Sequence, residues 1–154
     1  MMIRQGRCND VTQLKTLVIN TIENTCKSDY NSIQIEAWIS AIDDDQRWQD
    51  ILNNQMAFIA QDGEIITGFC TLAEGNYIDL FYIHHHYQRK GIAKLLYAEL
   101  EKEAKRQLQK ELTANVSKTA KSFFENVGFL AVKEQSVKVK GVALTNFKMV
   151  KKIE

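Results

Sequence analysis

The sequence predicts one mixed α/β domain in which helices cover both faces of a single sheet. The apolar residues recur at helical spacing up to about residue 54 and at strand spacing from 56 to 83. After residue 83, segments with helical spacing alternate with segments with strand spacing. The 154 residues are 45% hydrophobic and 25% charged, enough for one core. No repeat, linker or proline interrupts them. We therefore expect a single domain over residues 1–154, with a mostly antiparallel sheet of about six to seven strands.

The N-terminal third is predicted to be mainly helical. Ile3 and its neighbours form a short first strand, and Asp10 is placed to cap the helix that follows it. Ser32 is expected to cap a second helix, and Asp43–Asp45 precede a third, short one. The apolar spacing of the first helix comes from Val11, Leu14, Leu17, Val18 and Ile22.

A three-strand meander follows, because the period changes and glycine turns separate the apolar runs. Met56–Ala60 and Ile65–Ala73 are predicted to pair around a tight turn at Asp62–Gly63. Gly75–Asn76 then turns the chain into a third strand, Tyr77–Ile83.

The C-terminal half alternates helix and strand. After a loop at 84–90, a long helix with apolar residues every fourth position runs from Gly91 to about Gln107. Gly128 is expected to end a later short helix as a left-handed cap. The remaining predicted elements are the strand Leu112–Val116, the short helix around Ala120–Val127, and a hairpin of Phe129–Val139 and Val142–Val150 turning at Lys140–Gly141.

Charge is distributed unevenly along the chain. Residues 1–88 carry a net charge of −7 and residues 89–154 a net charge of +8, which together give the overall +1. The segregation either reflects an ordinary solvated surface, or it provides a basic face for a polyanionic ligand and an acidic face for a cationic partner.

Several classes of protein are excluded. The sequence has no CxxC pair among its three cysteines, Cys8, Cys26 and Cys70. This spacing predicts reduced thiols, so we expect a cytoplasmic protein. No signal peptide or apolar run of membrane-spanning length is visible, and we expect no membrane partner. Aromatic residues do not interleave with the basic ones, and we expect no nucleic-acid partner.

The segment Gln88–Ala93 joins a predicted strand to the start of the long helix. The first N–H groups of a helix have no partners within it, and the helix dipole makes this end a phosphate site. Gly91 lets the backbone approach a ligand closely, and Arg89 and Lys90 add positive charge. The alternative is an ordinary turn with a solvated basic pair.

In its context, this segment resembles the central motif of the GCN5-related N-acetyltransferases (GNAT). Asp79–Ala93 has that family's apolar strand, short loop and glycine-containing helix start. Ser117–Phe129 resembles a second family motif, in which a small polar residue, Ala, two aromatic residues and Gly-Phe follow at set spacing. Tyr30–Trp38 is similar to uncharacterised bacterial members. The order of elements fits the family across essentially the whole chain.

The resemblance implies transfer of an acetyl group from acetyl-CoA to a primary amine, by direct attack in a ternary complex. The loop amides of Gln88, Arg89, Lys90, Gly91, Ile92 and Ala93 would cradle the pyrophosphate. The strand residues Phe81, Tyr82 and Ile83 would pair with the pantetheine arm, with the Ile83 amide polarising the thioester carbonyl. Ser117 and Phe124 match family positions that lie near coenzyme A.

The catalytic residues are less clearly marked. A carboxylate or histidine is needed to take the proton of the amine, and Asp79, His84 and Glu74 are the candidates in that order. Asp79 alternates with Phe81 and Ile83 and is expected on the same face. The alternative is that Asp79 is only a solvated or ion-paired strand residue. Many relatives have a tyrosine acid where this chain has Phe124. Tyr82 or Ser117 would replace it, or the thiolate leaves unprotonated.

Other readings remain open. The Phe124 substitution also fits a non-catalytic acyl-CoA-binding sensor or regulatory module. His84–His86 suggests a metal, but neighbouring residues of an extended chain point to opposite sides, and we expect none. Cys70 is expected to be buried and inert, with an acyl-cysteine route as the alternative. The acceptor is a small-molecule or peptide amine, and a homodimer is possible.

Overall fold

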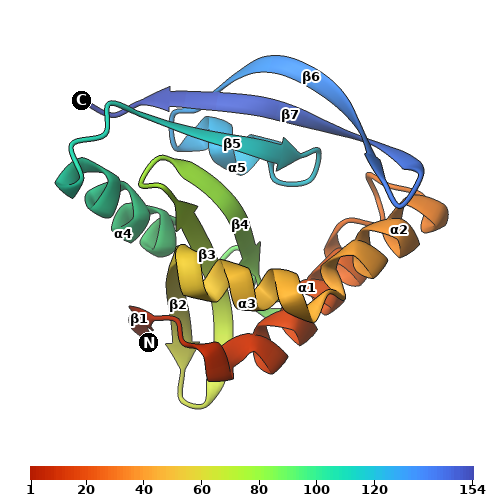
Figure 1. Cartoon of the computed structure of the whole chain (residues 1–154), viewed down its shortest axis with the longest axis horizontal. Helices are drawn as coiled ribbons and strands as arrows, with labels where there is room; N and C mark the ends of the chain where they lie inside the picture. The colour runs from red at the N-terminus through yellow and green to blue at the C-terminus, as the bar shows by residue number, and fades with distance from the viewer.

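The computed structural model describes residues 1–154, which form one seven-stranded sheet with the strand order β1-β2-β3-β4-β5-β7-β6 (Figure 1). Only β4 and β5 pair in parallel, so the predicted mixed, mostly antiparallel sheet is confirmed. The strands are β1 (Met2–Gln5), β2 (Met56–Asp62), β3 (Ile65–Ala73), β4 (Tyr77–Ile83), β5 (Glu111–Ser117), β6 (Leu130–Val139) and β7 (Val142–Lys152).

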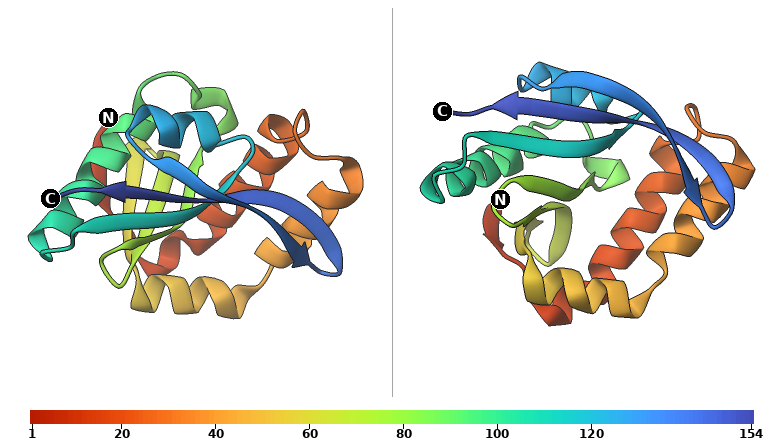
Figure 2. Two further views of the ribbon diagram at one scale, coloured as in Figure 1. Left: turned by 90° about the horizontal axis from the view of Figure 1, so that it is seen from above. Right: turned by 45° about the horizontal axis from the view of Figure 1, so that its top comes forward.

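Five α-helices cover the two faces (Figure 2). On one face lie α1 (Val11–Thr25) and α3 (Asp45–Asn54), packed on β2, β3 and β4 around a core that includes Leu14, Trp48 and Phe69. On the same side, α2 (Ser32–Ile42) packs on α1 and on the β6–β7 hairpin. On the other face lie α4 (Ile92–Arg106) and α5 (Lys121–Asn126), around a core that includes Leu96, Phe124 and Met149. Short 3-10 turns are η1 (Cys8–Asp10) and η2 (His85–Tyr87). No helix is both long and apolar enough to cross a membrane.

One predicted helix cap is wrong, and a second is in the predicted position without the expected hydrogen bond. Asn31, not Ser32, caps α2, because its side chain accepts the Gln34 N–H at 2.9 Å while the Gln34 side chain accepts the Asn31 N–H. Asp10 is the N-cap residue of α1, as predicted, but its carboxylate accepts hydrogen bonds from the Arg4 guanidinium and the Arg7 N–H and none from α1. The Arg4 hydrogen bond lowers the pKa of Asp10.

The acidic run before α3 is used within the fold. Asp44 is the N-cap of α3, accepting from the Arg47 N–H, and Asp43 and Asp45 both pair with Lys15 of α1. These carboxylates therefore anchor α3 to α1, and none of the three lines the cleft described below.

Strand β4 contains a bulge that opens the sheet. Ile78 is level with Leu72 of β3, but Phe81 is level with Cys70, so three steps on β4 match two on β3. The pairing of β4 with β5 covers only Tyr77 and Ile78. Beyond these residues the two neighbouring strands diverge, and a gap opens in the middle of the sheet.

Candidate active site

A cleft of about 1250 Å³ occupies the gap between β4 and β5. Its walls come from β4, the start of α4, the end of β5, α5, the α1–α2 turn and the β6–β7 hairpin. Of the predicted site residues, all but Glu74, His84 and Lys90 line it. Those that do are Asp79, Phe81, Tyr82, Ile83, Gln88, Arg89, Gly91, Ile92, Ala93, Ser117 and Phe124.

The backbone of β4 presents polar groups to this cleft. The His84 N–H donates to the Thr67 carbonyl of the β3 end, at 2.8 Å. Along an antiparallel strand, the backbone N–H groups of successive residues point alternately toward the partner strand and away from it. The N–H groups of Phe81 and Ile83 therefore point away from β3 and toward the gap. The Ile83 carbonyl accepts from Thr21 Oγ1 at 3.0 Å and Gln88 Nε2 at 2.8 Å, which fixes this end of β4.

The loop before α4 has the backbone shape of an anion site. Gly91 is the N-cap of α4 with φ 80°, and a Cβ at this position would meet no atom within 4 Å. Arg89 also has a positive φ, 60°, and is exposed together with Lys90. The loop therefore turns its backbone and two cations toward open space at the N-terminus of a 15-residue helix.

Asp79 lies at the bulge, and the bulge reverses its predicted facing. Ile78, Phe81 and Ile83 contact the core beneath α4 and α5, whereas Leu80 and Tyr82 contact the core beneath α1 to α3. Asp79 bonds on the α3 side: its Oδ2 accepts from Gln55 Nε2 at 2.8 Å, and its Oδ1 is 3.4 Å from Arg47. The expectation that Asp79 shares a face with Phe81 and Ile83 is therefore wrong.

This carboxylate is partly shielded and held in place. The Asp79 side chain is 16% exposed, while Arg47 is 45% exposed. The Gln55 Oε1 atom is buried and has no hydrogen-bond partner, so the amide is oriented by its bond to Asp79. Asp79 thus combines an oriented carboxylate with a place in the wall of the cleft.

His84 is turned away from the cleft wall. Its Nδ1 accepts the His86 N–H at 3.1 Å, as the cap of η2. Partial burial, and then the neighbouring His85 and His86, lower the pKa of His84. No three His, Cys, Asp or Glu side chains are grouped so as to hold a metal ion.

The residues considered for proton donation to the leaving thiolate differ in burial and in hydrogen bonding. Phe124 is buried and packs edge-on against Phe81. Burial raises the pKa of Tyr82, which keeps its hydroxyl protonated. Ser117 Oγ accepts the Ala120 N–H at 3.1 Å and so caps the turn into α5. Cys70 is fully buried in the α4-side core, away from the cleft lining.

The sequence reasoning missed a bridge across the cleft. The buried Tyr30 hydroxyl donates to the Thr145 carbonyl of β7 at 2.6 Å and accepts the Lys118 N–H at 2.9 Å. Beside it, Thr119 Oγ1 donates to Asp29. The α1–α2 turn is thereby fastened to the ends of β5 and β7. The resemblance at Tyr30–Trp38 was the only signal of this role.

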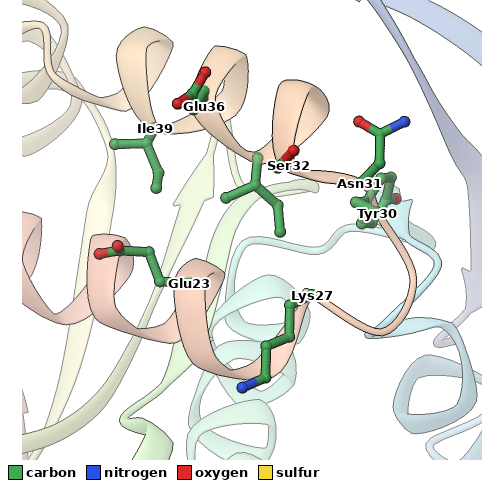
Figure 3. Close-up of a pocket in the computed structure, with 8 residues that line it drawn as sticks. Glu23, Lys27, Tyr30, Asn31, Ser32, Glu36 and Ile39 are labelled. Atoms are coloured by element: carbon green, nitrogen blue, oxygen red, sulfur yellow. The ribbon is translucent and has the colours of Figure 1, made fainter.

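A smaller hollow of about 420 Å³ lies between α1 and α2 (Figure 3). Its lining includes Glu23, Lys27 and Glu36, and it shares only Tyr30 with the lining of the large cleft. It contains none of the predicted site residues.

Comparison with known proteins identifies the class of protein. The profile of the family described as "Acetyltransferase (GNAT) domain" matches residues 26–151. The chain therefore belongs to the GNAT family, and it is an acetyl-CoA-dependent N-acetyltransferase.

Individual relatives agree with this assignment. The chain is 34% identical over 149 residues to the "Uncharacterized N-acetyltransferase YafP" of Escherichia coli K12, covering 97% of this chain and 94% of that protein. A GCN5-related N-acetyltransferase from Rhodopseudomonas palustris superposes with a TM-score of 0.94 at 30% identity, covering 98% and 94% of the two chains.

More distant structures share the fold. The PaiA N-acetyltransferase of Thermoplasma acidophilum, solved with coenzyme A, has a TM-score of 0.70 at 22% identity, and the match covers 98% of each chain.

Proposed function

We propose that this protein transfers the acetyl group of acetyl-CoA to a primary amine by direct attack in a ternary complex. The observation that carries the proposal is the position of Asp79. This oriented carboxylate stands at the β4 bulge, on the α3 side of a cleft whose other end is the anion-binding start of α4.

The two substrates enter this cleft from opposite sides. The pyrophosphate of acetyl-CoA binds the amides of Gln88–Ala93, with Arg89 and Lys90 supplying charge. The pantetheine arm lies along the unpaired edge of β4 between Phe81 and Ile83. The Ile83 N–H then donates to the thioester oxygen, where negative charge develops during attack. The acceptor reaches the carbonyl carbon from the side of Asp79.

During the reaction the acceptor nitrogen loses two protons and the leaving thiolate gains one. Asp79, directly or through a water molecule, takes a proton from the ammonium of the acceptor. The nitrogen lone pair forms a bond to the carbonyl carbon, the nitrogen gives up its second proton to solvent, the C–S bond breaks, and coenzyme A leaves as a thiolate. Phe124 has no proton to give, and burial raises the pKa of Tyr82, so the thiolate is protonated by solvent.

Asp79→Asn tests the assignment of the base. We expect its turnover to fall about a hundredfold or more, because the amide accepts no proton, while the thermal shift given by acetyl-CoA persists. The measurement is release of the coenzyme A thiol with a panel of primary amines. Asp62→Asn, at the exposed end of β2, is the matched control and keeps wild-type turnover. Wild-type turnover in Asp79→Asn contradicts the role of the base, and a wild type that releases no thiol with any amine contradicts amine transfer.

We also propose that the protein works in the cytoplasm. Cys8, Cys26 and Cys70 are free thiols, which fits the reducing conditions of the cytoplasm.

A further inference from the structure

One face of the C-terminal half of the sheet is covered by a helix only near the β6–β7 turn, where α2 packs beside Leu144. The α5 side of β5 is covered by the core that holds Leu112, Ala114 and Val116. The alternate residues Thr113, Asn115 and Ser117 point to the opposite face, the side on which α3 lies. Figure 1 shows β5, β7 and β6 running across the top of the molecule, with α5 behind them. This open face continues from the acceptor side of the cleft.

Two lysines face each other on this open face. Lys148 of β7 lies directly opposite both Asn115 of β5 and Lys133 of β6. Like charges in directly opposite positions destabilise a sheet, and neither lysine has an acidic partner. The acidic residue of this face, Glu111, lies opposite Lys152 at the far end of β5. An anion placed between Lys133 and Lys148 would relieve their repulsion.

A row of hydrogen-bonded polar side chains connects the lysines to the cleft. Gln135 Nε2 donates to Asn115 Oδ1 at 3.1 Å and to Asn146 Oδ1 at 3.0 Å. Asn115 Nδ2 in turn donates to the Tyr77 hydroxyl of β4 at 3.3 Å. Tyr77, Asn115 and Asn146 all line the cleft. These side chains offer amide and hydroxyl groups along the path from Asp79 to the lysines.

The register gives the length of this path. Tyr77 is level with Thr113 and Ile78 with Ala114, so Asp79 is the first residue of β4 beyond the pairing with β5. Lys148 is two strands from β4, or about 10 Å at the usual strand spacing. Three extended residues of a peptide span about 10 Å.

We propose that the acceptor is a short peptide-like zwitterion, whose amine reaches Asp79 while its carboxylate lies between Lys133 and Lys148. The amide row of Asn115, Gln135 and Asn146 provides partners for the peptide groups between the two ends. The inference rests on the proposed function, because it takes Asp79 as the position of the reacting amine.

The test compares triglycine with triglycine amide, which differ only in the terminal charge. Each is titrated calorimetrically into the protein saturated with coenzyme A, so that no turnover is required. We expect the free acid to bind about fivefold more tightly, the effect of two exposed ion pairs. This preference disappears in Lys133→Gln/Lys148→Gln and declines as salt is added. It persists in Lys138→Gln/Lys102→Gln, which removes two charges on the opposite face of β6 and on α4.

Each outcome decides the inference. Equal binding of the two peptides, a preference that survives in Lys133→Gln/Lys148→Gln, or failure of both peptides to bind overturns it. Thiol release from acetyl-CoA, measured in parallel, separates the two proposals. Acetylation of amines without a carboxylate in preference to triglycine overturns the zwitterionic acceptor and leaves amine transfer standing. Carboxylate-dependent binding without thiol release from any amine contradicts the transfer itself.

Discussion

Gly91 is the residue whose backbone shape most directly prepares the protein for acetyl-CoA. Its positive φ strains any other residue, and the space beside it is open. We expect saturating acetyl-CoA, at a hundred times its dissociation constant, to stabilise the wild type by about 2.7 kcal/mol, or several degrees. Gly91→Glu places a carboxylate at the proposed pyrophosphate site, and we expect it to abolish this thermal shift. Gly91→Ala, which adds strain without charge, retains most of it. A full shift in Gly91→Glu contradicts a phosphate site at this loop.

For individual residues, the sequence predicted well which of them line the cleft, and less well the direction in which their side chains point. The glycine and the basic pair before α4 follow from general rules for helix starts. The facing of Asp79 does not, because alternation along a strand holds only where no bulge intervenes. The bulge at β4 has no proline or glycine to mark it.

The bridge from the α1–α2 turn is the element that closes one side of the cleft. Tyr30→Phe removes the hydroxyl that serves both the Thr145 carbonyl and the Lys118 N–H. Leaving these groups without their partner costs about 1–3 kcal/mol of unfolding free energy, which urea denaturation measures. Tyr87→Phe is the control, since its hydroxyl makes no hydrogen bond within the protein, and it keeps wild-type stability. Equal stability of the two variants contradicts a fastening role for Tyr30.

The elements themselves were largely predictable, because glycine turns and apolar spacing are local signals. β3 and β4 have the predicted bounds, and α4 begins one residue after Gly91. The cap of α2 was mispredicted because two polar residues are adjacent: Asn31 and Ser32 are both good caps, and the partner Gln34 decides between them. The Tyr30 bridge joins residues more than eighty positions apart, which no local pattern encodes.

The separation of charge along the chain has a consequence for the whole molecule. The basic half, residues 89–154, contributes the start of α4 and the strands beyond the cleft, although the net charge is only +1. We expect the dissociation constant for acetyl-CoA to rise on the order of tenfold between 50 and 500 mM salt, as screening weakens the attraction of its phosphates. Calorimetry measures this, with the uncharged pantetheine as a control that salt leaves unchanged. A salt-independent affinity contradicts an electrostatic role for the basic half.

The two residue pairs that join β4 to β5 divide the sheet into a four-stranded and a three-stranded block. Each block completes its own ladder by antiparallel neighbours, and α4 is the covalent span between them. The width of the opening is therefore set by how α4 seats against β2 and β3, rather than by the internal order of either block. An extended substrate bound between β4 and β5 would then act as an additional strand. It would give the unpaired backbone of β4 the partner that the fold itself does not provide.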